Sequence, residues 1–254
     1  MLKKITALAV LSILFMHLLS CSAGAECSSW YIKRNGSSAP SFPEDPIAMK
    51  ALDCFFIDTD ASLCGEKKIY LTFDAGYLNE SLKEIVDTLN ENDITAAFFV
   101  LDNLILKEPE LIKSMAERGH LICNHTKNHK NLSNSSYNEI SHDLESLEEI
   151  CQEKAGVEMA KYFRFPEGKY SKEAIKLVQS LGYKTVFWSF AYEDWDNSKQ
   201  PNSDSAMKKI LSNTHCGAIM LFHPTSATNA KIFPDLIKAW RDMGYSFASL
   251  DELK

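Results

Sequence analysis

From residue 67 to the C-terminus, short apolar segments alternate with amphipathic helical patterns, and this alternation most constrains the fold. In the helical segments, apolar residues recur at spacings of three and four, as at Leu82, Ile85, Val86 and Leu89. Alternating strands and helices predict βα units that share one parallel sheet. Seven units favour an α/β fold, a distorted (β/α)7 barrel, with a doubly wound sheet as the alternative. We expect strands at residues 68–73, 95–100, 120–123, 161–164, 184–190, 217–222 and 246–249.

Six polar side chains of catalytic type follow the predicted strands closely. The carboxyl ends of parallel strands open on one face of such a fold, so residues far apart in the sequence can converge there. Each residue alone has an ordinary explanation, such as a turn or helix cap for Asp74, a core histidine for His223 or a surface arginine for Arg164. Six together favour one active site. They are Asp74, His125, His129, Arg164, Asp194 and His223.

Two of these residues, His125 and His129, are four positions apart. On a helical turn, that spacing places both imidazoles on one side, within reach of one metal ion. A pair of histidines alone is a weak signal, because exposed or hydrogen-bonded histidines are common. The position after a predicted strand favours the metal interpretation, and we expect His125 and His129 to be ligands.

The first 25 residues differ in character from the rest of the chain. Lys3 and Lys4 precede an apolar stretch over residues 5–19, which is the order of regions in a signal peptide. Cys21 ends a sequence similar to a bacterial lipobox, which predicts lipidation, while small residues before Glu26 offer a second cleavage position. An uncleaved anchor is the remaining alternative. We expect export to the cell envelope or beyond, with membrane contact only through the signal or a lipid.

The remaining sequence has the composition of one globular domain. The 254 residues are 45% hydrophobic and 24% charged, and no second core is required. We expect residues 26–66 to wrap around a main domain at residues 67–254. The net charge of −7 argues against nucleic acid or an anionic membrane as the partner, and we expect a monomer.

Cysteines are frequent enough to suggest a cross-link. Without Cys21, six remain, an even number in an export setting. Their spacing matches no zinc motif. Cys54 and Cys64 flank a short polar loop, and we expect a disulfide between them. Cys123 and Cys216 lie in or beside predicted strands, where we expect small buried residues.

Five motifs, taken in order, resemble those of the polysaccharide deacetylase family, which shares the NodB homology domain. They are Thr72–Gly76, His125–His129, Arg164–Gly168, Asp194–Trp195 and Leu221–His223. The resemblance covers residues 67–253 and implies the distorted (β/α) barrel of that family. Further segments resemble the branch that forms muramic δ-lactam in spore cortex. These are Trp30–Arg34, Gly76–Tyr77, Phe187–Ala191 and His223–Ala230.

The resemblance implies an acid and base pair. Asp74 would be the general base that takes a proton from water, and His223 the general acid that protonates the leaving amine. Arg164 would hold Asp74 ionised and oriented. Asp194 would tune the pair through His223 or Arg164.

The resemblance also implies a divalent cofactor and a sugar groove. His125 and His129 would bind zinc, cobalt or manganese, and the ion would polarise the acetyl carbonyl. The family's third ligand is an aspartate, but this sequence has Ala75, a departure common in the δ-lactam branch, so we expect weak metal binding. Four residues would contact the substrate, the first through its backbone amide: Tyr77, Phe165, Pro166 and Trp195.

The implied function is hydrolysis of the acetamide of N-acetylmuramic acid in peptidoglycan. Deacetylation of N-acetylglucosamine in peptidoglycan, chitin or another polysaccharide is an alternative within the same chemistry. Ala75 leaves a third hypothesis, a catalytically silent glycan-binding lipoprotein. Retention of Asp74, Arg164, Asp194 and His223 argues against it, because a binding module needs no acid and base pair. In every case the expected partner is an N-acetylated glycan.

Overall fold

A curled parallel sheet forms the centre of the molecule. The computed structural model describes residues 27–253; the expected signal peptide and the lipidation position Cys21 lie outside them. The strands of the sheet are β4 (Cys54–Phe55), β5 (Lys68–Ala75), β6 (Ala97–Val100), β7 (Leu121–Asn124), β8 (Ala160–Phe163), β10 (Lys184–Val186), β11 (Ala218–Phe222) and β12 (Ser246–Ala248). Strands β5, β6, β7, β8 and β10 lie side by side in chain order, and β11 returns to pair with β5. All of these ladders are parallel, as the alternation of strands and helices predicted.

The two edges of the sheet approach each other, which makes it a distorted barrel. The segment after β10 lies between β4 and β11, where Ser189 N donates to Ile219 O at 2.9 Å. Phe190 forms an isolated parallel bridge with Met220. The expected barrel is therefore confirmed. The strand expected at residues 184–190 is regular only in its first three residues.

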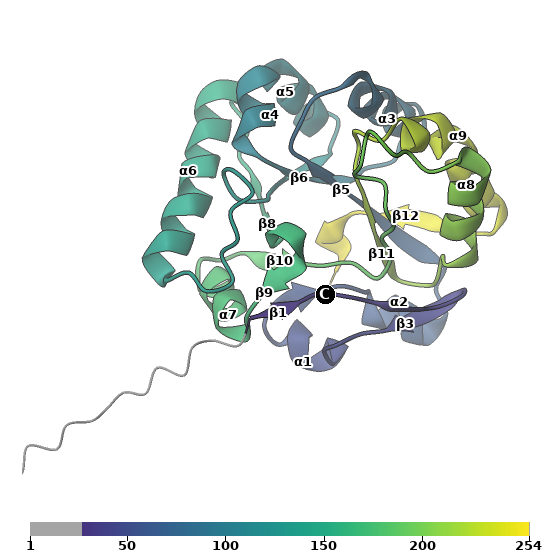
Figure 1. The fold of residues 1–254 in the computed structure, drawn as a ribbon, viewed down its shortest axis with the longest axis horizontal. Coiled ribbons are helices and arrows are strands. Elements are labelled where there is room, and N and C mark those ends of the chain that lie inside the picture. The colour runs from purple at the N-terminus through teal and green to yellow at the C-terminus, as the bar shows by residue number, and fades with distance from the viewer. Residues whose placement is uncertain (1–26, 254) are drawn as a thin grey trace, which may run out of the picture.

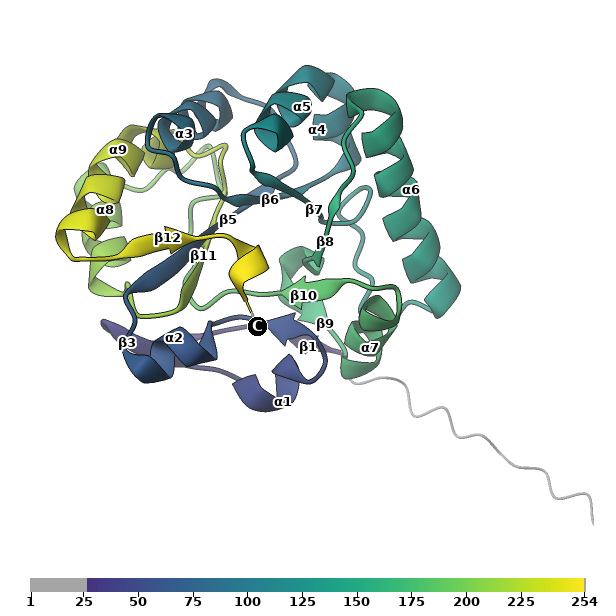
Figure 2. The same cartoon turned by 180° about the vertical axis from the view of Figure 1, so that it is seen from behind.

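Side chains of the strands alternate between two apolar clusters on opposite faces of the sheet. Leu71 of β5 packs in the cluster beneath the helices, whereas its neighbour Tyr70 belongs to the cluster inside the barrel, with Phe99 and Ile219. Burial on both faces explains why the strands are almost continuously apolar in sequence. The inner cluster also includes Leu250, which begins the 3-10 turn η2 (Leu250–Glu252) next to the C-terminus (Figure 2).

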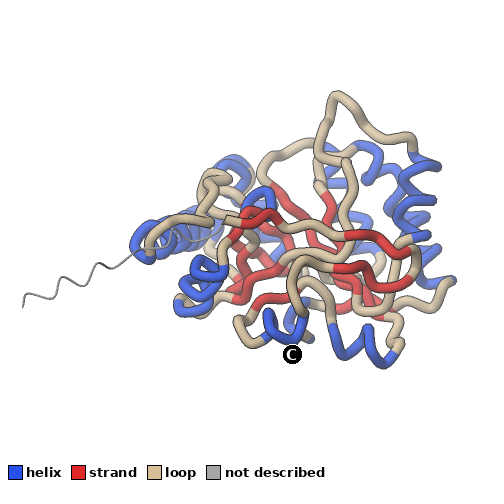
Figure 3. The backbone as a smooth tube through the Cα atoms, turned by 60° about the horizontal axis from the view of Figure 1, so that its bottom comes forward, coloured by secondary structure: helices blue, strands red, loops and turns tan. Residues whose placement is uncertain are grey.

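Helices cover the outer face of the sheet (Figures 1 and 3). They are α3 (Glu80–Glu91), α4 (Asp102–Lys107), α5 (Pro109–Glu117), α6 (Tyr137–Ala155), α7 (Lys172–Ser180), α8 (Ser203–Ser212) and α9 (Ala227–Asp242). Local sequence fixes several of their ends. Ser136 and Glu139 form a capping box at the start of α6, and α7 stops before Gly182, whose φ of 82° a side chain would disfavour. Ser226 caps α9 by accepting a hydrogen bond from Asn229 N at 3.1 Å, which brings this turn to the strand ends.

None of the helices within residues 27–253 combines the length and the apolar character needed to span a membrane.

The segment before β5 contains more regular structure than the sequence predicted. Its strand β4 forms an edge of the sheet beside β10. Trp30 stacks on Phe187 with ring centroids 4.8 Å apart, and its Nε1 donates to Trp188 O at 2.9 Å. This segment therefore contacts both the sheet and the chain after β10. Its other elements are β1 (Ser28–Ser29), β2 (Lys33–Asn35), β3 (Ser38–Ser41), α1 (Pro46–Lys50) and α2 (Thr59–Cys64), and β1 pairs with β9 (Lys169–Tyr170).

The expected disulfide between Cys54 and Cys64 is wrong. Cys54 is buried on β4 in a cluster with Trp30 and Phe56, whereas Cys64 is exposed at the end of α2. The two cysteines belong to separate elements, β4 and α2, and both are free in the structure. The six cysteines of the described chain are free thiols. Of the two expected to be small buried residues, Cys123 is buried and Cys216 only partly so.

Candidate active site

The residues predicted from the strand ends converge on one pocket of about 560 Å³. Two of them, Arg164 and Asp194, are buried and bond to residues that line it. The other four line the pocket directly: Asp74, His125, His129 and His223. Convergence of residues from five separate segments is what the parallel sheet predicted.

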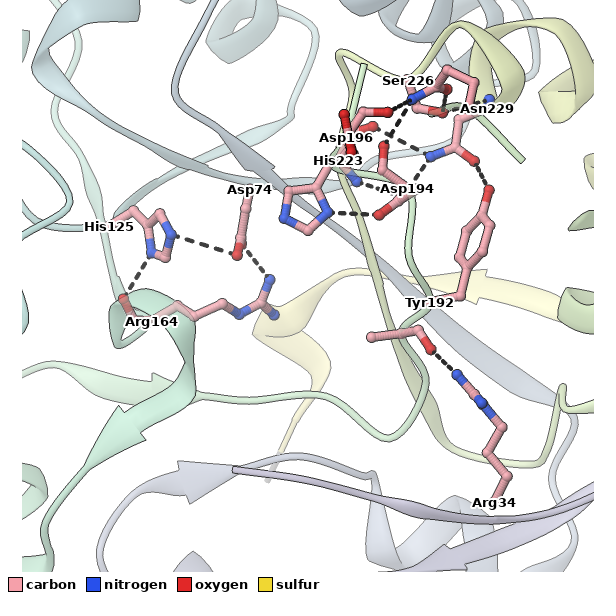
Figure 4. A network of polar contacts seen from close by, with 12 residues as sticks. Arg34, Asp74, His125, Arg164, Tyr192, Asp194, Asp196, His223, Ser226 and Asn229 are labelled. Carbon is pink, nitrogen blue, oxygen red and sulfur yellow. Dashed lines mark hydrogen bonds and ion pairs between the residues drawn. The ribbon is translucent and has the colours of Figure 1, made fainter. Parts of the chain in front are cut away.

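Asp74, His125 and Arg164 form the first of two groups, here called the strand-end cluster. Asp74 is the second-to-last residue of β5. Its Oδ1 accepts a hydrogen bond from Arg164 Nη1 at 2.8 Å, and its Oδ2 lies 3.5 Å from His125 Nε2. Figure 4 shows the carboxylate between the guanidinium and the imidazole. Arg164 therefore holds one oxygen of Asp74 by a hydrogen bond, and His125 lies close to the other.

The guanidinium of Arg164 is fully enclosed by the barrel. Its Nε donates to Val186 O at 2.9 Å and its Nη2 to Thr72 Oγ1 at 2.9 Å. The guanidinium carbon lies 4.1 Å from the centre of the Phe99 ring, a cation–π contact. Because a buried charge that loses its partner is costly, Asp74 and Arg164 depend on each other.

The charges around Asp74 keep it ionised. Burial acts to raise its pKa, but the groups of His125, Arg164 and His223 together outweigh burial and lower the pKa. Burial lowers the pKa of His125 to about 4, against the opposing charge of Asp74, so this ring is neutral at pH 7. His125 Nδ1 bonds to the Arg164 carbonyl at 2.8 Å and so carries the proton, because a carbonyl only accepts. Nε2 then presents a lone pair to the carboxylate.

Those facing acceptors on His125 and Asp74 suit a cation placed near them, and His129 supplies a second imidazole. The rings of His125 and His129 lie 5.1 Å apart between centroids. Across residues 27–253, no group of three or more His, Cys, Asp or Glu side chains has the arrangement of a metal site. Ala75 is fully buried and does not line the pocket. The two imidazoles would hold a divalent ion with Asp74 beside them and with water or substrate in the remaining positions.

The loop that carries the two histidines is not the helical turn that the sequence predicted. Thr126 and His129 adopt left-handed backbone angles, with φ of 68° and 62°. Thr126 N donates to Asn124 Oδ1 at 2.9 Å, and Lys130 N donates to Thr126 Oγ1 at 3.0 Å. Side-chain acceptors thus replace the helical hydrogen bonds, and the two imidazoles meet through a tight loop.

Asp194, His223, Asn229 and Tyr192 form the second group, here called the loop cluster. Asp194 Oδ1 bonds to His223 Nδ1 at 2.7 Å, and Oδ2 accepts from His223 N at 2.9 Å and from Asn229 Nδ2 at 2.7 Å. The Tyr192 hydroxyl donates to Asn229 Oδ1. Asp194 therefore contacts His223 and not Arg164, which decides between the two partners that the sequence left open.

Asp194 stabilises the protonated form of His223. Burial lowers the pKa of His223, but the hydrogen bond to Asp194 and the charges of Asp194 and Asp74 outweigh burial and raise the pKa. Nδ1 of His223 is occupied by Asp194, and Figure 4 shows the other ring nitrogen on the side of Asp74. In the protonated ring, Nε2 thus presents a proton to the pocket.

Two residues expected in a sugar groove lie elsewhere. Phe165 is fully buried in an apolar cluster and Pro166 is buried in the turn after it, so neither lines the pocket. The chain turns sharply at Glu167, with φ of 57°, and Glu167 faces the pocket instead. The other two expected residues, Tyr77 and Trp195, do line the pocket, and these residues are 62% and 57% exposed.

Other pocket residues had no assigned role in the sequence. Trp188 and Tyr192 line the wall, and Asn229 lies in the first turn of α9 behind His223. Trp188 and Asn229 fall in segments noted for their branch resemblance, but no pattern there indicated a contact with Asp194. The contact depends on the loop after β10 reaching the start of α9, and strand and helix periodicity carries no information about loop paths.

Comparison with known proteins agrees with this geometry. The family model for polysaccharide deacetylase matches residues 64–186, which contain the strand-end cluster. Peptidoglycan-N-acetylmuramic acid deacetylase PdaA of Bacillus subtilis is 36% identical over 89% of this chain and 85% of its own length. Peptidoglycan-N-acetylglucosamine deacetylase PgdA of Listeria monocytogenes is 30% identical over 74% of this chain and 39% of its own length.

Solved structures give the same answer. The structure of Bacillus subtilis PdaA, a family 4 carbohydrate esterase, superimposes with a TM-score of 0.83 and 33% sequence identity. The match covers 90% of this chain and 97% of that one, so it includes the loop cluster as well as the sheet. Similarity of this extent, together with the pocket, means that the chain belongs to the polysaccharide deacetylase family, hydrolases that act on carbon–nitrogen bonds.

Proposed function

We propose that this protein is exported and removes the acetyl group from N-acetylmuramic acid in peptidoglycan. The observation that carries the proposal is that Asp74, bonded to Arg164, and His223, bonded to Asp194, line the same pocket. The pKa of Asp74 is lowered and that of His223 is raised, which suits one to accept a proton and the other to donate one. Amide hydrolysis needs this combination, because water must lose a proton and the amine must gain one.

Asp74 acts as the general base. It takes a proton from water as the water oxygen forms a bond to the acetyl carbon. Arg164 holds the carboxylate in its ionised form and fixes its direction through the 2.8 Å hydrogen bond. The backbone amide of Tyr77, at the pocket wall, is the candidate donor to the oxyanion that develops on the carbonyl oxygen.

His223 acts as the general acid. Its Nε2 proton passes to the sugar nitrogen as the carbon–nitrogen bond breaks, which gives acetate and a free amine. Asp194 holds the ring in the required orientation through Nδ1 and stabilises its positive charge before the transfer. A divalent ion held by His125 and His129 would, when bound, polarise the acetyl carbonyl.

The choice of muramic acid is supported by the relative with the same substrate in its name. That relative aligns over 89% of this chain, including the segments Trp30–Arg34 and Phe187–Ala191. The exposed aromatic residues Tyr77 and Trp195 at the pocket suit the apolar faces of a sugar ring. A substrate in the cell wall also requires that residues 1–25 direct the protein out of the cell, with or without lipidation at Cys21.

Muropeptide analysis tests the substrate. The purified protein is incubated with peptidoglycan, either intact or after an amidase has removed the stem peptides. We expect deacetylated muramic acid, with more of it when the peptide is absent. His223→Ala, which lacks the acid, and Asp74→Asn, which keeps the size of the base, should each lose roughly a hundredfold or more in turnover.

Each other outcome has a definite meaning. Deacetylated glucosamine alone would move the protein to the N-acetylglucosamine substrate class, where its Listeria relative belongs by name. Release of no acetate from any glycan by the wild type would favour a silent binding protein. Full activity in folded Asp74→Asn would contradict the assignment of the base.

A further inference from the structure

We propose that Asn229 is a positioning residue for the proton donor His223. The Asn229 amide holds Asp194 against His223, and the Tyr192 hydroxyl in turn holds the amide; these contacts are here called the lock. The inference rests on the proposed role of His223 as the general acid. It adds a residue to that site which touches neither the substrate nor the reacting atoms. The distances and the complementarity of donors and acceptors in the loop cluster carry it.

The orientation of the Asn229 amide follows from its neighbours. Asp194 is a carboxylate and only accepts, so the group of Asn229 that lies 2.7 Å from Asp194 Oδ2 is the amide nitrogen. The amide oxygen then faces the Tyr192 hydroxyl, which donates to it. The same nitrogen lies 3.3 Å from His223 O. Every polar atom of this fully buried side chain therefore has a partner.

The lock constrains the carboxylate of Asp194 at both oxygens. Oδ1 is bonded to His223 Nδ1, while Oδ2 takes two donors, His223 N and Asn229 Nδ2. Three bonds from two residues leave the carboxylate no free rotation about its last torsion. The imidazole of His223 is consequently held with Nε2 on the side of Asp74, where the proton is used (Figure 4).

The start of helix α9 is itself anchored, so Asn229 is a rigid support. Ser226 Oγ donates to Gln200 Oε1 at 2.6 Å, and Thr228 Oγ1 donates to Pro201 O at 2.7 Å. Gln200 Nε2 in turn donates to Asp196 O at 2.9 Å, two residues after Asp194. Hydrogen bonds through Gln200 and Pro201 thus connect the loop that carries Asp194 to the start of the helix that carries Asn229.

Two variants separate positioning from packing. Asn229→Leu keeps approximately the same shape but removes all three hydrogen bonds of the amide. Asn229→Asp keeps the shape and the acceptor, and donates to Asp194 only while the introduced carboxyl group is protonated. Thr214→Val is the matched control, because Thr214 is a buried hydrogen-bonding residue that contacts Trp240 and Ile210, away from the pocket.

The experiment measures kcat, KM and their pH dependence with amidase-treated peptidoglycan, and the pKa of the His223 ring by NMR. For Asn229→Leu we expect kcat to fall about tenfold or more with little change in KM. The NMR pKa of His223 and the alkaline limb of kcat should move to lower pH, because a released Asp194 stabilises the cation less. The charged groups that face His223 are Asp194, Asp74 and Arg164, and these variants leave all three in place.

Asn229→Asp should retain activity only toward acid pH, where the introduced group donates, and lose it as pH rises. Tyr192→Phe, which frees the amide oxygen, should show a smaller loss of kcat in the same direction. Thr214→Val should lower the melting temperature without moving either pH readout. The inference is overturned if Asn229→Leu, measured on folded protein, keeps the wild-type pKa of His223 and the wild-type alkaline limb.

The roles of His223 and of Asn229 can be refuted separately. If His223→Ala keeps its activity, the proposed acid is wrong whatever the Asn229 variants do. If His223→Ala is inactive while Asn229→Leu matches the wild type in kcat and in pH dependence, only the positioning role is wrong. The NMR titration needs no substrate, so it decides the lock even if the glycan assignment changes.

Discussion

The strand-end cluster and the loop cluster hold two titratable side chains in one pocket by different means. Asp74 is fixed by a buried opposite charge, the guanidinium of Arg164, which is enclosed by strands of the barrel. His223 is fixed by Asp194, whose remaining bonds come from a backbone amide and the neutral side chain of Asn229. The first arrangement is built into the core, and the second is assembled where a loop meets the start of a helix.

This difference separates stability from activity. A buried ion pair contributes little net stability when intact, but the loss of one partner leaves a charge without compensation. Neutral hydrogen bonds cost less to remove, although an orphaned buried donor or acceptor still carries a penalty. Variants of the strand-end cluster should therefore damage folding and chemistry together. Variants of the loop cluster should mainly damage chemistry.

The largest expected effect is at Arg164. Arg164→Met should lower the free energy of unfolding by about 3–5 kcal/mol, because Asp74 loses its buried partner. Asn229→Leu removes a neutral amide and should cost about 1–3 kcal/mol. Chemical denaturation of both variants and the wild type measures the comparison. Arg164→Lys is the control, since it keeps the charge but lacks the fork that reaches Asp74 and Thr72 together.

Equal losses of stability for Arg164→Met and Asn229→Leu would break the distinction between the two clusters. A loss at Arg164 that Arg164→Lys fully restores would sharpen it, since charge alone would then account for the effect. Activity is measured on the folded fraction of each variant. There Arg164→Met should fall roughly a hundredfold or more, because the base is no longer held ionised.

The barrel and most of the site residues were accessible from sequence because both depend on periodic patterns. Buried parallel strands appear as continuous apolar segments, and their carboxyl ends share one face, so Asp74, His125 and His223 are found by position alone. The edge strand β4 was missed because it is a two-residue strand with no alternation around it. Local periodicity has no signal for such a short edge.

The errors in the site have a common physical origin in irregular backbone. The left-handed backbone angle of Thr126 makes the segment from His125 to His129 a loop and not a helical turn. The left-handed angle of Glu167 turns that residue to the pocket, while Phe165 of the same motif is buried. Asparagine and histidine adopt such angles more readily than most residues, whereas a glutamate in a sequence does not indicate a left-handed angle. The lock around Asn229 depends on tertiary contacts between residues 35 positions apart, which no local pattern encodes.

Metal removal acts on the two histidines at the strand-end cluster and not on the loop cluster. Its effect on turnover should be the second largest. With two imidazoles and an alanine at position 75 in place of a carboxylate ligand, a divalent ion should bind weakly and exchange readily. Chelator should reduce wild-type turnover roughly tenfold or more, and added zinc, cobalt or manganese should restore it. Calorimetric titration should show ion binding in the wild type and none in His129→Ala.

The matched control for the metal experiment comes from the other cluster. Asp194→Asn keeps both imidazoles and should bind the ion as the wild type does, although its acid is impaired. Loss of ion binding in Asp194→Asn would mean that the clusters are coupled through the ion. Undiminished wild-type activity in chelator, with the same heat of titration for wild type and His129→Ala, would mean that the histidines hold no catalytic ion and contact the substrate directly.

The smallest expected effect lies where the N-terminal segment supports the loop cluster from outside. Arg34 of β2 donates from Nη2 to Ala191 O at 2.6 Å, and its guanidinium lies 5.9 Å from the centre of the Phe190 ring. Ala191 and Tyr192 line the pocket, so this contact holds part of its wall. Because Arg34 is exposed, the bond should be worth only about 0.5–1.5 kcal/mol, or roughly two- to tenfold.

Arg34→Ala should therefore raise KM by roughly two- to tenfold while leaving kcat and the ion affinity close to those of the wild type. Lys33→Ala is the matched control, because Lys33 is an exposed cation on the same strand and the described residues offer it neither an ion pair nor a side-chain hydrogen bond. Steady-state kinetics on the two variants decides the point. A fall in kcat with unchanged KM would place the influence of Arg34 on the proton donor, through the loop that carries Asp194. Identical kinetics for Arg34→Ala and Lys33→Ala would mean that the N-terminal segment supports the fold without shaping the pocket.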